Sequence, residues 1–100
     1  MNYEIYADQL KTIADPNRIK IIDLLSCGEM CACDILKYFE FTQPTLSHHM
    51  KTLEKAGFVT VTKKGKWHHY SLNDEVLKDF MDHLNQLFFH SDDCICQKEQ

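Results

Sequence analysis

The sequence lacks any apolar run of the about 18 residues that a membrane-spanning helix needs. It also lacks a signal peptide, because Met1-Asn2-Tyr3-Glu4 is not a charged segment that leads into an apolar one. We therefore expect a cytoplasmic protein with no membrane partner. Its 100 residues are 44% hydrophobic and 26% charged, which predicts a single small globular domain.

Glycine and proline are scarce, with three and two copies. So few glycines leave little room for a phosphate-cradling loop, and no nucleophile, base and acid are grouped. We therefore expect neither an enzyme nor a catalytic cofactor. The five cysteines are an odd number and include no Cys-x-x-Cys pair, unlike a secreted disulfide scaffold or a zinc ribbon. In the cytosol, clustered cysteines more often bind metal or sense oxidation.

Positive charge is in deficit overall, but it is concentrated in one segment. The net charge is −4, yet residues 41–73 contain five lysines and one glutamate, a local balance of +4 that leaves −8 for the rest. A basic segment on an acidic body is typical of a local nucleic-acid surface.

Hydrophobic periodicity predicts four helices before residue 57. The first covers residues 3–14, and the second starts at Pro16 behind an Asp15 cap and ends near Gly28. A third helix follows a short connector at residues 29–32, and a fourth runs from Thr42 to about Ala56. The side chains expected to face inward are, in chain order, Tyr6, Leu10, Ile13, Ile19, Ile22, Leu25, Ile35, Leu36, Phe39, Leu46, Met50 and Leu53.

After residue 57 the helical spacing of apolar residues gives way to two short runs of β-branched and aromatic residues, as in a β-hairpin. Residues 58–62 and 67–72 are predicted strands, joined by a basic turn at residues 63–66. A last helix begins at Asn73 or Asp74, and its apolar stripe is too broad for one small core. Together with the first helix, it is predicted to form a homodimer interface. The predicted fold is therefore mainly α: a winged helix-turn-helix domain of about five helices over residues 1–90, with a flexible cysteine-containing tail at residues 91–100.

Residues 41–70 are the predicted DNA-reading segment. With Leu46, Met50 and Leu53 facing inward, the outer arc of the fourth helix carries short polar groups and cations suited to base edges and phosphates. The predicted DNA-binding residues are Gln43, Thr45, Ser47, His48 and Lys51, with Lys63, Lys64 and Lys66 in the wing. His49 lies at the edge of the inward face and is predicted to pack rather than to read bases. His68 and His69 must point to opposite faces of their strand, so at least one is expected to be structural.

Four pieces of the sequence together resemble the ArsR/SmtB family of bacterial metal-responsive repressors. They are residues 14–18 (ADPNR), 28–34 (GEMCACD), 43–50 (QPTLSHHM) and 66–70 (KWHHY). The second piece resembles the arsenite-responsive branch found in arsenic-resistance operons. The resemblance implies a transcriptional repressor that binds its own operator DNA as a dimer. It also implies release when arsenic(III) or antimony(III) binds as the inducer.

Cys31 and Cys33 are the candidate inducer ligands, since thiolates are soft ligands that favour thiophilic ions. A helix that begins here would favour the thiolate form through its dipole. Helical residues i and i+2 point about 200° apart, so chelation is predicted to distort the start of the third helix. That distortion would misplace the neighbouring reading helix.

A third thiolate is implied by the resemblance, because trivalent arsenic and antimony prefer three. Some family members have another cysteine one turn after the pair, where this sequence has Leu36 and Lys37. Cys94 or Cys96 is the candidate third ligand, from the same subunit or from the dimer partner. Alternatively, the two tail cysteines form a separate site and the pair acts alone. Cys27 is predicted to fill the core.

Three alternatives remain open at this point. The same fold could respond to zinc or cadmium, for which His83 and His90 with Asp79 or Asp82 are the available ligands on the last helix. It could instead respond to oxidation of its cysteines. A metal-sequestering protein without operator affinity is the third alternative, and the basic wing argues against it.

Overall fold

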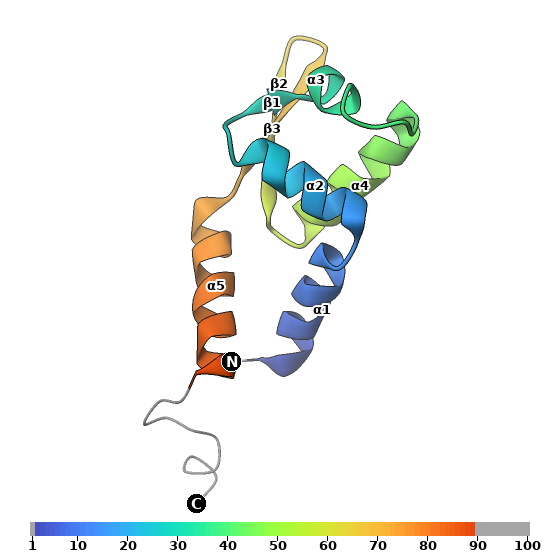
Figure 1. Ribbon diagram of the computed structural model, residues 1–100. Helices are drawn as coiled ribbons and strands as arrows, with labels where there is room; N and C mark the ends of the chain where they lie inside the picture. Colours follow the sequence, from blue (N-terminus) through green and yellow to red (C-terminus); the bar gives the residue numbers. More distant parts are fainter. Residues whose placement is uncertain (1, 90–100) are drawn as a thin grey trace, which may run out of the picture.

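The computed structural model describes residues 2–89, and its helices and strands follow the predicted order (Figure 1). The elements are α1 (Tyr3–Ile13), α2 (Pro16–Leu25), β1 (Met30–Cys31), α3 (Ala32–Leu36), α4 (Gln43–Lys55), β2 (Val59–Lys64), β3 (Trp67–Leu72) and α5 (Asp74–Phe88). Five helices and one hairpin within these residues confirm the predicted winged helix-turn-helix fold.

The three strands form one antiparallel sheet in the order β1-β3-β2. The connector strand β1 pairs with the wing, with Met30 opposite Tyr70 and Cys31 opposite His69. The predicted four-residue turn is wrong, because the ladder between β2 and β3 continues to the pair of Lys64 and Trp67. Gly65 has a φ of 65°, which permits the tight turn that follows.

The core lies between α2, α3, α4 and the sheet. Leu46, Met50 and Leu53 are at most 1% exposed, as the periodicity of α4 predicted. In α2 the inward residue is Ile21, which is fully buried, whereas the predicted Ile19 is 51% exposed. The helix is rotated so that Ile21 and Leu25, one turn apart, face the core together.

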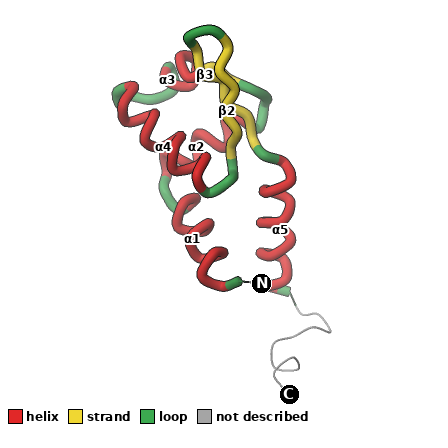
Figure 2. Tube along the Cα trace, turned by 180° about the vertical axis from the view of Figure 1, so that it is seen from behind, coloured by secondary structure: helices red, strands yellow, loops and turns green. Residues whose placement is uncertain are grey.

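Helices α1 and α5 extend from this core toward the end of the molecule opposite the wing (Figures 1 and 2), and Tyr6 and Phe80 are their contributions to its buried cluster. They meet through Tyr6, whose hydroxyl donates to the backbone oxygen of Phe80 at 3.0 Å. Tyr6 and Phe80 are the only buried residues of their helices. Ile5, Met81 and Phe88 are 60%, 57% and 74% exposed, so much of the apolar face of both helices is uncovered.

Within residues 2–89, no helix combines the length and apolar character required to cross a bilayer.

Candidate DNA interface and cysteine site

Helix α4 presents the polar face that the sequence predicted. Thr42 precedes it in extended conformation, and the Thr42 hydroxyl lies 3.3 Å from that of Thr45. Its buried side anchors it in the core, so the opposite side is left to solvent. There Gln43, Thr45, His48 and Lys51 are exposed, and Ser47 is half-buried.

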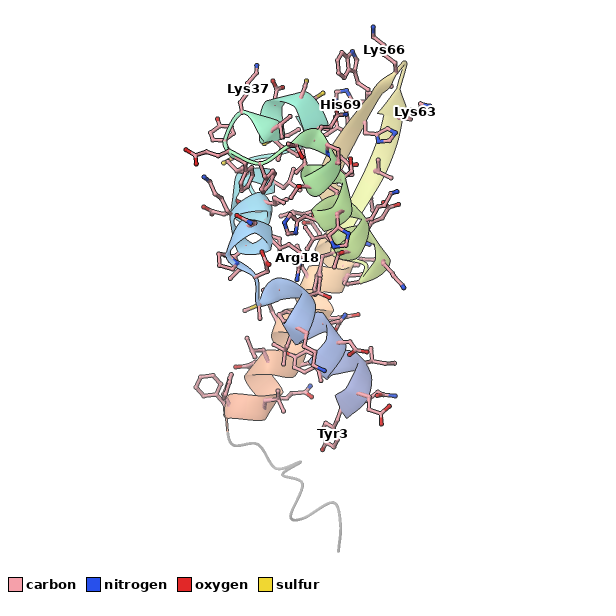
Figure 3. The ribbon with its side chains drawn as sticks, turned by 90° about the vertical axis from the view of Figure 1, so that its right-hand side faces the viewer. Tyr3, Arg18, Lys37, Lys63, Lys66 and His69 are labelled. Carbon is pink, nitrogen blue, oxygen red and sulfur yellow. The ribbon has the colours of Figure 1, made fainter. Side chains whose placement is uncertain are left out.

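The wing carries its lysines in two different settings. Lys63 and Lys66 point away from the body near the tip of the hairpin (Figure 3), and the Lys66 ammonium lies 5.7 Å from the centre of the Trp67 ring. Lys64 is instead paired, with its Nζ 2.8 Å from Oε2 of Glu29. This hydrogen bond lowers the pKa of the Glu29 carboxyl. The pairing was not predicted, because Glu29 lies 35 residues away in the sequence.

His49 is buried, as predicted, and it does not lie on the reading face. Its Nδ1 is 3.2 Å from Nη1 of Arg18. Burial is the main reason that the pKa of His49 lies below its ordinary value. In the sequence, Arg18 belongs only to the family-like segment 14–18, so its contact with α4 was not predicted.

The cysteine pair has a geometry different from the predicted one. Cys31 is the N-cap of α3, with φ −68° and ψ 144°, and it therefore lies outside the helix. The expected 200° separation does not apply, because the extended residue turns its side chain back toward Cys33. The two Sγ atoms are 2.7 Å apart, and both thiols are free. The prediction that the sulfurs diverge until the helix unwinds is wrong.

The expected stabilisation of the thiolate is also not found at Cys33. The hydrogen bond with Cys31, followed by desolvation and the nearby charges of Cys31 and Asp34, raises the pKa of Cys33. Helix α3 has only five residues, so its dipole is weak, and Asp34 in its first turn opposes a second negative charge.

The other cysteines do not complete a site within the described residues. Cys27 is exposed, so the prediction that it fills the core is wrong: α2 ends at Leu25 and leaves it in the following turn. Cys94 and Cys96 lie outside the described residues, as does His90 of the zinc alternative. Across residues 2–89, no three His, Cys, Asp or Glu side chains are grouped closely enough to hold an ion.

A cavity of about 200 Å³ joins the cysteine site to the reading elements. Cys33 forms part of its wall from α3, Gln43 and Ser47 face it from α4, and Lys66 and Trp67 close it from the wing. An ion or molecule bound here would therefore contact the supports of both DNA-reading elements.

Comparison with known proteins agrees with this arrangement. Residues 15–61 match the family model described as "Bacterial regulatory protein, arsR family". The chain is 46% identical to an arsenical resistance operon repressor of Staphylococcus aureus, covering 97% of this chain and 93% of the relative. It is 52% identical to the Staphylococcus xylosus repressor of the same name, covering 86% of this chain and 79% of the relative. A crystal structure described as a "possible transcriptional regulator for arsenical resistance" superimposes with a TM-score of 0.76 at 28% identity, covering 83% of this chain and 86% of that one.

Proposed function

This chain belongs to the ArsR family of bacterial regulatory proteins and is a DNA-binding transcriptional repressor rather than an enzyme, and we propose that trivalent arsenic or antimony releases it from its operator. The observation that carries the inducer proposal is the thiol pair of Cys31 and Cys33, of which Cys33 lines a cavity shared with α4 and the wing. Two relatives that share about half of its residues are arsenical resistance operon repressors, which supports the same class of inducer. We place its action in the cytoplasm, where operator DNA is found.

We propose that the protein binds DNA as a homodimer through α1 and α5. A protein of this size rarely leaves large apolar side chains such as Met81 and Phe88 in water without a partner. A second copy would cover both helices symmetrically. It would also set two copies of α4 at a fixed spacing, as a helix-turn-helix protein needs for two operator half-sites.

Inducer binding at the cysteine pair would require only a small opening of the site. Two thiolates on one ion stand about 3.3–3.8 Å apart if each bond is about 2.3 Å long, as for zinc. The Sγ atoms are 2.7 Å apart in the free protein, so they must separate by roughly 1 Å. Because Cys31 lies opposite His69 in the sheet, its displacement acts directly on wing strand β3. This coupling replaces the predicted unwinding of α3.

We assign the third thiolate to Cys94 or Cys96. Trivalent arsenic and antimony favour soft sulfur donors, and the described residues offer only two sulfurs in contact. The assignment predicts that removing both tail cysteines weakens the inducer response without changing operator affinity.

The function is tested by titrating the protein–operator complex with arsenite, antimonite, cadmium and zinc. Cys31→Ser and Cys33→Ser should keep wild-type operator affinity and lose release by arsenite, because each removes one of two adjacent ligands. Cys27→Ser is the matched control, since this cysteine is exposed and separate from the pair. Fluorescence anisotropy of a labelled operator duplex measures both properties.

The outcomes separate the alternatives. If the Cys31/Cys33 double variant still releases DNA with arsenite, the assignment of these two cysteines as inducer ligands is wrong. Release by zinc or by peroxide, but not by arsenite at the same concentration, would support the other inducers. Metal binding without operator affinity would contradict the repressor function.

A further inference from the structure

Arg18 lies where α1, α2 and α4 meet (Figure 3). Its Nε donates to the backbone oxygen of Thr12 in the last turn of α1, at 2.6 Å. Its Nη1 lies 3.2 Å from Nδ1 of His49, near the middle of α4. A guanidinium has no acceptor, so Nδ1 of His49 must accept this bond and carry its proton on Nε2. One side chain therefore bonds to both α1 and α4.

Arg18 is itself fixed in place by the start of α2. Oδ1 of Asp15 accepts from the backbone nitrogens of Asn17 and Arg18 at 2.9 and 3.2 Å. Oδ2 of Asp15 lies 3.9 Å from Nη1 of Arg18. The Arg18 side chain is only 16% exposed, so water screens these contacts weakly.

The imidazole of His49 is oriented by an aromatic stack from the turn before α4. The Phe41 ring lies 5.6 Å from it and stacks on the Phe39 ring at 4.5 Å. Nζ of Lys20, a residue of α2, lies 4.8 Å from the centre of the Phe39 ring, so the aromatic stack also contacts α2. The His49 ring is thus held between Arg18 of α2 and the aromatic stack in the turn before α4.

We propose that Arg18 and His49 are positioning residues that fix the angle between α1 and α4, and thereby set the operator half-site spacing that the dimer accepts. This inference rests on the proposed DNA-binding dimer, in which α1 contributes to the interface and α4 reads the DNA. Half-sites lie about one helical turn, 34–36 Å, apart, so a small rotation of α4 relative to α1 moves both reading heads out of register. Neither residue needs to touch DNA to have this effect.

The contact has a built-in pH dependence. Burial, the Arg18 charge and the neighbouring His48 lower the pKa of His49, while Asp15 opposes the shift. The folded-state pKa is below the 6.5 of a free imidazole, so the ring is neutral and accepts from Arg18 at pH 7. Protonation removes the acceptor and places an imidazolium beside a guanidinium. The contribution to operator affinity is therefore full above pH 6.5 and is lost as the pH falls through the folded-state pKa.

The test uses the full chain and an operator duplex mapped by footprinting, together with duplexes whose half-site spacing is changed by one base pair. We expect Arg18→Met to reduce affinity for the correct spacing about tenfold, the scale of one charge-assisted hydrogen bond, and to weaken discrimination between spacings. Arg18→Lys, which keeps the charge but cannot make both bonds, should behave similarly. Lys11→Met is the control, because it removes a cation from an exposed position on α1, close in sequence to Arg18.

His49→Asn supplies the second measurement, because its Oδ1 lies roughly where Nδ1 was but does not titrate. It should match the wild type at pH 8 and bind operator up to about tenfold more tightly than the wild type once the pH is below the folded-state pKa of His49, which an NMR titration of the wild type measures. His48 is present in both proteins, so it does not contribute to the difference between them. The Arg18→Met/His49→Asn double variant should lose little more than Arg18→Met alone.

Unchanged spacing preference in both Arg18 variants, or identical pH profiles for wild type and His49→Asn, would overturn the proposal. A wild-type protein that binds no operator at pH 8 would instead overturn the proposed function. The contact itself can be tested without DNA, since Arg18→Met should raise the pKa of His49 in an NMR titration. An unchanged His49 titration would show that the two residues do not interact.

Discussion

At the scale of single residues, the wing lysines should contribute unequally to DNA binding. Lys63→Ala and Lys66→Ala should each weaken binding to all sequences and reduce the salt dependence of log K by about one, as expected for a lost phosphate contact. Lys64→Ala should cost less, because Lys64 is already paired with Glu29 at 2.8 Å. Anisotropy titrations across salt concentrations measure these slopes.

Lys78→Ala, which removes an exposed cation from α5, is the control for net charge. Glu29→Gln should free Lys64 and steepen the salt dependence. A Lys64→Ala variant as weak as Lys63→Ala would contradict this division of roles.

At the scale of elements, the start of α5 depends on one cap. Oδ1 of Asn73 accepts from the backbone nitrogen of Val76 at 3.3 Å. Asn73→Ala should lower the free energy of unfolding by about 1 kcal/mol in urea denaturation, since a helix donor loses its partner. Gln86→Ala changes another amide side chain, on the exposed side of α5 away from Met81 and Phe88, and should have an effect within about 0.5 kcal/mol. Equal losses in both variants would contradict a capping role.

Some features of the helices and strands could be predicted from the sequence, and others could not. The core face of α4 was predictable because Leu46, Met50 and Leu53 repeat at the helical period, and the wing because Gly65 follows a β-branched run. The rotation of α2 was not predictable, because Ile19, Ile21 and Ile22 are equally apolar and only packing selects among them.

The sequence names the residues of the candidate site, but it did not predict their geometry correctly. The spacing of Cys31 and Cys33 indicated a ligand pair, yet a shift of the helix start by one residue decides whether the two sulfurs meet. The Arg18–His49 contact spans 31 residues of sequence and leaves no local pattern from which it could be inferred.

At the scale of the whole molecule, the uncovered faces of α1 and α5 predict self-association. Met81→Glu and Phe88→Glu should each convert the proposed dimer to monomer, because each places a charge on an apolar surface that the partner would bury. Operator affinity should fall sharply in parallel, since one monomer reads one half-site. Sedimentation equilibrium measures the association state.

Gln86→Glu adds the same charge on the opposite side of α5 and serves as the control. A Met81→Glu protein that remains dimeric and retains wild-type operator affinity would place the interface elsewhere.

The pairing of β1 with β3 has a consequence for the sensitivity of the response. Cys31 and His69 are partners in one ladder. Under the proposed function, the inducer and the operator would therefore act on the same strand pair. Thermodynamic reciprocity then requires that the operator weaken inducer binding by the same factor by which the inducer weakens operator binding. Repressor on DNA would therefore respond at a higher arsenite concentration than free repressor. Repressor molecules that are not bound to DNA would therefore bind arsenite first. Release from the operator would begin only above a threshold arsenite concentration, which rises with the number of repressor molecules in the cell.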